Sequence, residues 1–243
     1  MEPDRASSSR WNRDDERRHP DAAVEAWWWW ASALDTATGA MVGVYVGLEL
    51  RGGRFDYWAG LVRVGQPYLY VEELDGTGLR SGLEIKPPEM WAGHECDVAF
   101  GQWSLGNEAH GVLLDDPAEA WRRAHGTLTP CTFDVEWYAS APPEELLPGD
   151  GHGFGMRGRD GYRQWGEADV RIELPEGFVE FVGPAERVHV WGAPYLPTSV
   201  AMPSDDSVAR RGLRAPYRRT DGILVDQVVA TSPTRGSRWW VTR

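Results

Sequence analysis

Residues 133–137 alternate carboxylates with apolar side chains, and a carboxylic acid can transfer a proton during a reaction. In an extended strand, Asp134 and Glu136 lie on one face, whereas Phe133, Val135 and Trp137 lie on the other. If the apolar face points into a core, both carboxylates are solvated. If the strand lines a hollow barrel with its polar face inward, burial raises their pKa values toward those of general acids. The alternation is compatible with both arrangements.

A second alternation places Arg187, His189 and Trp191 on one face of a strand. These side chains would make a poor solid core but a suitable wall for a polar pocket with an aromatic rim. Arg187 would pair with an acid, Asp134 and Glu136 being candidates, and His189 could transfer protons near neutral pH. The alternative is a structural salt bridge beside a histidine with satisfied hydrogen bonds. We take these two acids, Arg187 and His189 as the candidate catalytic residues.

Tryptophan is unusually abundant, with 14 residues in the chain, four of them consecutive at 27–30. In a strand, two of these four rings face inward and two face outward. The inward pair could line a ligand cavity, because indoles pack poorly into a solid core and each N–H needs a partner. A solid aromatic core is the alternative. The candidate ligand contacts are Tyr57, Trp58, Trp137, Gln164, Trp165 and Trp191, with Gln164 orienting water or a ligand carbonyl.

Short apolar runs separated by Gly, Pro and Asp position these side chains, and such runs indicate strands. A hairpin is predicted between 41–50 and 55–64, because Gly52-Gly53 accepts the positive φ angles of a tight turn. Asp116 and Pro117 predict one short helix over 117–124. Further strands are expected at 67–73, 79–86, 95–105, 109–115, 129–140, 162–174, 178–191, 223–231 and 238–241. The fold class is therefore all-β: a lipocalin-like or calycin-like antiparallel barrel, or a strongly curved sandwich, of about a dozen strands.

The remaining segments set the expected domain organisation. Residues 1–21 are polar and mixed in charge, and we expect a disordered leader before a single β domain over 22–243. Residues 141–161 are rich in Pro, Gly and acidic residues, and we expect either a mobile lid or a disordered segment. A long connection over 193–221 carries five arginines, which either neutralise nearby carboxylates or contact an anionic partner: Arg210, Arg211, Arg214, Arg218 and Arg219.

Charge and composition exclude several classes of function. The net charge of −12 argues against a nucleic-acid partner, and no apolar stretch is long enough for a spanning helix. Without an apolar signal segment, a cytoplasmic protein is expected, with Cys96 and Cys131 as buried thiols rather than a disulfide. His94 and His110 lack the spacing of metal ligands, and no phosphate-binding or dinucleotide-binding motif is present. We expect no metal and no cofactor.

Three segments together resemble a known group of proteins. GTLTPCTFDVEWYAS at 126–140, GYRQWGEADVRI at 161–172 and ERVHVWG at 186–192 are similar to segments of the lipocalin-related AttH/CrtC-like proteins, which include carotenoid 1,2-hydratases. The resemblance implies a calycin-like fold that holds a hydrophobic ligand of terpenoid or polyketide type. The chain is shorter than the two-barrel members, and Val190 stands where a serine is expected.

Two functions follow from this pattern. The first is binding of a hydrophobic terpenoid, steroid or polyketide-like molecule with acid-initiated hydration or cyclisation, in which Asp134 or Glu136 protonates an alkene and aromatic faces stabilise the cation. The second is a carrier that holds a lipid or pigment without altering it. A protein-interaction module with a solid core is the weaker alternative. The fold does not choose among them, because one fold hosts many functions.

Overall fold

The computed structural model describes residues 10–35, 39–63, 65–115, 126–146 and 160–192 with their side chains, and the backbone of 159, 213–218, 224–231 and 237–238. The helix expected at 117–124 lies outside these residues. So do most of the expected lid and most of the connection over 193–221, including three of its five arginines.

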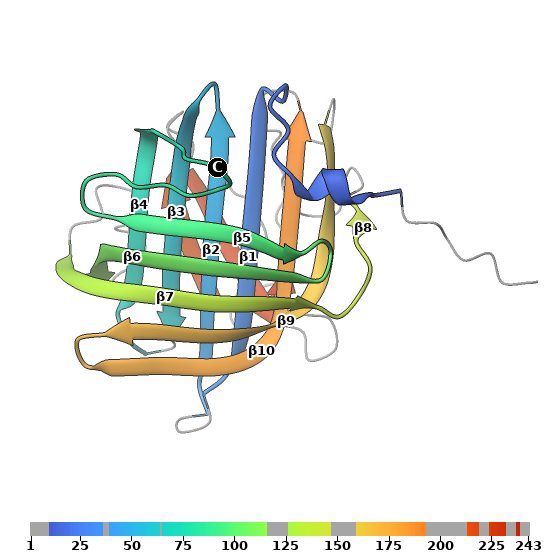
Figure 1. Ribbon diagram of the computed structural model, residues 1–243. Coiled ribbons are helices and arrows are strands. Elements are labelled where there is room, and N and C mark those ends of the chain that lie inside the picture. The colour runs from blue at the N-terminus through green and yellow to red at the C-terminus, as the bar shows by residue number, and fades with distance from the viewer. Residues whose placement is uncertain are drawn as a thin grey trace, which may run out of the picture.

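Ten strands make one antiparallel sheet, and eight of them pair in a closed ring (Figure 1). The ring runs β10-β1-β2-β3-β4-β6-β7-β9 and closes because β9 also pairs β10, while β5 pairs β6 and β8 pairs β9. The predicted all-β antiparallel barrel is confirmed. The ring strands are β1 (Val24–Leu34), β2 (Met41–Arg51), β3 (Arg54–Arg63), β4 (Tyr68–Thr77), β6 (Gln102–Leu114), β7 (Thr127–Ala139), β9 (Arg159–Leu174) and β10 (Gly177–Gly192). The others are β5 (Trp91–Val98), β8 (Glu144–Glu145), β11 (Leu213–Arg218), β12 (Leu224–Thr231), β13 (Ser237–Arg238) and the 3-10 helix η1 (Arg13–Glu16).

The barrel has two layers whose strands cross steeply. Figure 1 shows β1 to β4 side by side behind β5, β6 and β7, with β9 and β10 curving from the front layer into the back one. The register agrees, because β10 pairs β1 only through residues 185–192. Just before this stretch Gly183 passes the backbone of Ser32 so closely that a Cβ would collide with its carbonyl. A glycine there allows the strand to change layers.

The tryptophan run lies in β1 and splits between the two faces of the sheet, as predicted. Trp27 and Trp29 belong to the core inside the barrel, whereas Trp28 and Trp30 belong to a second core on the outer face. The backbone of β11 lies against β2 and β3, and that of β13 lies against β1 and β10, over this outer face (Figure 1). The β2–β3 hairpin is also confirmed, with φ of 54° at Gly52 and 83° at Gly53.

Three expectations about segments were wrong. Residues 79–86 form no strand, and only Ile85 makes an isolated bridge to Ala92. The strand expected at 95–105 is a hairpin, because the chain turns at Phe100 with φ of 56°, and 109–115 continues β6. Apolar residues stand on both sides of that turn, so the run resembles a single strand. Residues 10–21, expected in the disordered leader, include η1 and the buried side chains of Trp11 and Glu16. Trp11 and Glu16 contact residues that are distant in the sequence, so the composition of residues 10–21 alone does not predict their burial.

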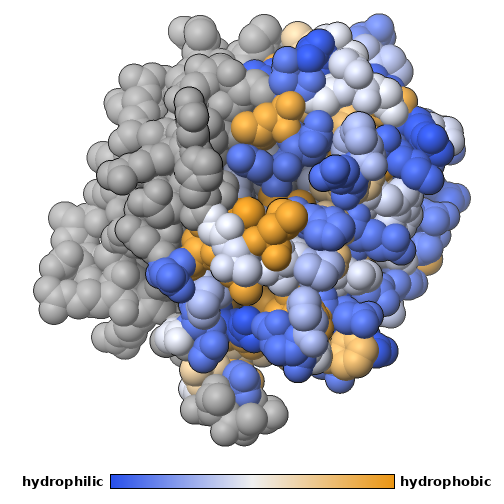
Figure 2. Space-filling model, turned by 90° about the vertical axis from the view of Figure 1, so that its left-hand side faces the viewer, coloured by the Kyte–Doolittle hydropathy of each residue, from blue (hydrophilic) through white to orange (hydrophobic). Residues whose placement is uncertain are grey.

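On the face shown in Figure 2, the described residues are mainly hydrophilic, and apolar residues form small groups among them. Within the part of the chain that the structure describes, no helix has the length and apolar character needed to span a membrane.

Candidate functional site

Residues 10–23 lie across one end of the barrel and direct a carboxylate into it. Asn12 caps η1: its side chain accepts the Asp14 N–H at 2.8 Å, and the Asp15 carboxylate accepts the Asn12 N–H at 2.7 Å. This reciprocal cap fixes the short helix. Arg10 pairs with Glu145 on β8 and so ties the segment to the barrel. As a result Glu16, at the end of η1, is only 4% exposed.

Glu16 forms a buried ion pair with Arg187, which is 0% exposed. Both terminal nitrogens of Arg187 donate to the Glu16 carboxylate, at 2.8 and 2.6 Å, and one also donates to Gln164 Oε1 at 2.9 Å. Trp103 Nε1 and Tyr162 OH donate to the same carboxylate, at 2.9 and 3.0 Å. Two-point Arg–carboxylate pairing is strong and sets orientation as well as charge. We call these five residues the Arg187 cluster.

The charges of this pair are stabilised locally. Burial by itself raises the pKa of Glu16, but the charge and hydrogen bonds of Arg187 and the bond from Tyr162 hold that pKa below its usual range. The guanidinium of Arg187 also lies 5.2 Å from the ring centre of Trp103 and 5.1 Å from that of Trp137, distances typical of cation–π contacts. Burial raises the pKa of Tyr162 well above its ordinary value, so its phenol remains a donor.

A second polar group, formed by His19, Glu25 and His189, lies beside the Arg187 cluster. Glu25 Oε1 is 2.8 Å from His19 Nδ1 and 2.9 Å from His189 Nε2, while Glu25 Oε2 accepts the backbone N–H of His19 at 2.8 Å. The His19 ring stacks on Trp191 at 4.0 Å, and the His189 ring stacks on Trp27 at 4.6 Å. We call His19, Glu25 and His189 the histidine–glutamate triad.

The two groups are joined through Tyr162, whose hydroxyl lies 3.3 Å from His189 Nδ1. Burial lowers the pKa of His189 in spite of its bond to Glu25, so its imidazole is neutral at physiological pH. Burial would raise the pKa of Glu25, but hydrogen bonds from His189 and His19 hold it below its usual range. The barrel end therefore contains two ionised carboxylates and one buried guanidinium.

Several buried donors inside the barrel have no hydrogen-bond acceptor among the described residues. They are the indole N–H groups of Trp27, Trp29 and Trp137 and the Nε–H of Arg187. Two of them are neighbours, because Trp29 pairs Arg187 in the β1–β10 register. An unpartnered buried donor costs about 1–3 kcal/mol, so four of them in one interior call for acceptors.

The structure brings part of the predicted site together and separates the rest. Arg187, His189, Trp191 and Gln164 share the inward face of β9 and β10, and Trp137 and Tyr57 face the interior from β7 and β3. Trp58 belongs to the outer core, and Trp165 lies on the outward face of β9 under Arg163. Asp134 is exposed on the outer face of β7. Glu136 lies on that face too and accepts hydrogen bonds from Gln102 at 3.1 Å and Ser104 at 3.0 Å.

The acid opposite Arg187 is therefore Glu16, and sequence reasoning missed it together with His19 and Glu25. One signal was available: Asn12 followed three residues later by Asp15 is a helix-start pattern, which argues against disorder there. Nothing in the sequence could place Glu16 opposite a residue 171 positions away.

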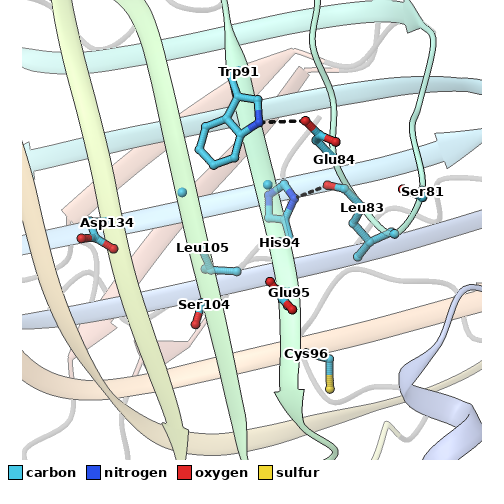
Figure 3. Close-up of a pocket in the computed structure, with 13 residues that line it drawn as sticks. Ser81, Leu83, Glu84, Trp91, His94, Glu95, Cys96, Ser104, Leu105 and Asp134 are labelled. Carbon is cyan, nitrogen blue, oxygen red and sulfur yellow. Dashed lines mark hydrogen bonds between the residues drawn. The ribbon is translucent and has the colours of Figure 1, made fainter.

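A separate pocket of about 600 Å³ lies beside β5, and Figure 3 shows its lining. Trp91 Nε1 donates to Glu84 at 3.1 Å, and His94 Nδ1 donates to the Leu83 carbonyl at 2.9 Å. The exposed Asp134 contributes to the wall of this pocket. None of the Arg187 cluster contributes to it, so the pocket and the barrel end are different places.

Comparison with known proteins finds a similar solved structure. No protein-family model and no curated protein matches the chain. A solved structure from Nitrosomonas europaea, described as a "putative AttH", is similar to this chain. The match has 15% sequence identity and a TM-score of 0.49, and it covers 99% of this chain and 75% of the other. No residue role follows from a likeness at this identity.

Proposed function

We propose that this protein binds an apolar small molecule that carries acceptor oxygens, with its apolar body against the indole rings inside the barrel. The observation that supports this most directly is the set of buried donors without acceptors: three indole N–H groups and the Nε–H of Arg187. A carbonyl, hydroxyl or ether oxygen would satisfy such donors, whereas a pure hydrocarbon would leave them unpaired. Terpenoids, steroids and polyketides carry such oxygens.

Binding without turnover agrees better with the charges than acid-initiated hydration or cyclisation does. A general acid must hold a proton near neutral pH, but hydrogen bonds and neighbouring charge keep Glu16 and Glu25 ionised. Asp134 and Glu136, the acids chosen from the sequence, lie on the outer face of β7. Among the described residues the interior thus offers donors for recognition rather than an acid for catalysis, and we favour a carrier.

The test compares matched ligands. Tryptophan fluorescence is followed while the protein is titrated with a steroid ketone and with the same steroid skeleton lacking oxygen. We expect saturable quenching with tighter binding of the ketone. Trp137→Phe removes one N–H and keeps an aromatic ring, and should weaken ketone binding by roughly 3- to 10-fold with little effect on the hydrocarbon.

The control is Trp165→Phe, which removes an indole from the outward face of β9 and should leave both affinities unchanged. Native mass spectrometry of the protein as purified from cells extends the test beyond steroids. Equal affinity for the two skeletons, or a co-purified ligand without oxygen, would contradict the proposal. Absence of binding to both probes, together with no co-purified molecule, would also contradict it.

A further inference from the structure

We propose that the histidine–glutamate triad binds one divalent first-row transition metal ion. The ligand atoms of His19, Glu25 and His189 all lie within 4.8 Å of one another. They come from three segments: the residues after η1, the start of β1 and the end of β10. This proposal is independent of the ligand proposed above, because it concerns different atoms of the barrel end.

The distances fit a shared ion. Glu25 Oε1 lies 2.8 Å from one imidazole nitrogen and 2.9 Å from the other. Two ligand atoms about 2.1 Å from a metal are about 3.0 Å apart at right angles and about 3.4 Å apart at a tetrahedral angle, so each imidazole would move away from the carboxylate by about 0.1–0.6 Å on binding an ion. Two imidazole nitrogens and one carboxylate oxygen suit zinc, cobalt and iron, whereas calcium and magnesium prefer sets made of oxygen alone.

The ligands are held before any ion arrives. Stacking on indole rings fixes the planes of the two imidazoles. The His19 ring lies at 6° to the Trp191 ring, and the His189 ring lies at 18° to the Trp27 ring. The backbone N–H of His19 occupies Glu25 Oε2, which leaves Oε1 directed between the rings. Ligands locked by packing and hydrogen bonds lose little entropy on binding a metal.

His189 also has the outer partner that metal-bound histidines usually have. Its Nδ1 lies 3.3 Å from Tyr162 OH, which itself donates to Glu16 at 3.0 Å. With the Nδ1 proton donated to Tyr162, the Nε2 lone pair faces the Glu25 carboxylate at 2.9 Å. A metal ion between the two atoms would use that lone pair. In the other tautomer of the neutral ring, His189 Nε2–H donates to Glu25. The rival to a metal is therefore this purely structural, hydrogen-bonded triad.

Titration of the metal-stripped, full-length protein without an affinity tag separates these alternatives. Cobalt binding is followed by visible absorption, and zinc binding by calorimetry and by competition with cobalt. We expect one ion per chain, visible bands of a nitrogen- and oxygen-ligated cobalt, and displacement of cobalt by zinc. His19→Ala and Glu25→Gln should each weaken zinc binding at least about 10- to 100-fold. His110→Gln, at an exposed histidine of β6, is the matched control and should leave the affinity unchanged.

A measurement on the unmodified protein keeps the test decisive if a variant fails to fold. Nitrogen-15 NMR of the histidine rings should show zinc-dependent shifts of the metal-bound nitrogens in two of the six histidines. Stoichiometric zinc that shifts no ring nitrogen, or shifts those of His110 instead, would overturn the proposal. So would the absence of cobalt and zinc binding, or an unchanged affinity in folded His19→Ala and Glu25→Gln proteins.

Discussion

Replacing Glu16 by Gln tests whether the buried ion pair is a structural requirement of the barrel. The substitution preserves shape but removes the charge that compensates Arg187, which is 0% exposed and donates two hydrogen bonds to Glu16. It also turns an NH₂ group toward one of two donors, Trp103 Nε1–H or Tyr162 O–H, because these bond to different oxygens of Glu16. Breaking a buried pair from one side costs about 3–5 kcal/mol, since the remaining charge is left without a partner. We expect that loss in the free energy of unfolding.

Urea denaturation of both proteins measures this difference, provided that the slope of the transition is unchanged. The control is Glu144→Gln, which breaks a 2.9 Å pair with Arg163 between more exposed side chains and should cost only about 0–1 kcal/mol. Replacing Glu16 and Arg187 together by Leu removes both charges and should be less destabilising than Glu16→Gln by at least about 2 kcal/mol. A loss below about 1 kcal/mol in Glu16→Gln would refute the reasoning, because Arg187 would then not depend on Glu16.

Three further predictions concern other buried groups. Burial lowers the pKa of His94 from 6.5 to about 4, so acidification from pH 6.5 to about 4 should remove roughly 3 kcal/mol from the free energy of unfolding. The His94→Phe protein should lack that part of the pH dependence. Identical pH profiles of urea denaturation in the two proteins would contradict the prediction. Gly47→Ala would push a Cβ into the Trp58 ring and should cost about 1–3 kcal/mol, measured by thermal unfolding. The pKa values of Cys96 and Cys131 are raised to about 12 and 11, chiefly by burial; both thiols should resist iodoacetamide at about pH 8 and react once unfolded, so rapid native labelling would refute this.

The sequence predicts the strands of the barrel better than the partners of the polar side chains buried inside it. Alternation of side chains grouped Trp137 with Phe133 and Val135, and Arg187 with His189, because a strand has a fixed period of two. It left open which face of β7 points inward. The same rule split the tryptophan run correctly. It failed at residues 95–105, where Phe100 takes a positive φ. The apolar positions there change from even (Val98, Phe100) to odd (Trp103, Leu105) across Gly101, and this change of phase marks the turn.

The partners of the buried polar groups could not be predicted for a different reason. Glu16 lies in a charged, proline-containing segment that by composition resembles a solvated leader. Its burial depends on Arg187, Trp103 and Tyr162, three residues from separate strands. Pairing across such distances is decided by topology, and the order of strands around the ring is not encoded in any local pattern. Reasoning from local pattern instead directed Arg187 toward Asp134 or Glu136, the acids of the alternation at 133–137.

Residues 10–23 link the two polar groups at the barrel end. This segment supplies Glu16 to the Arg187 cluster and His19 to the histidine–glutamate triad, and Tyr162 contacts both groups. An ion held by His19 and the Glu16–Arg187 pair would both stabilise residues 10–23 in their position against the barrel. Because such coupling is reciprocal, each interaction must strengthen the other by the same free energy. Weakening the ion pair is therefore expected to lower metal affinity at a site that Glu16 itself does not touch.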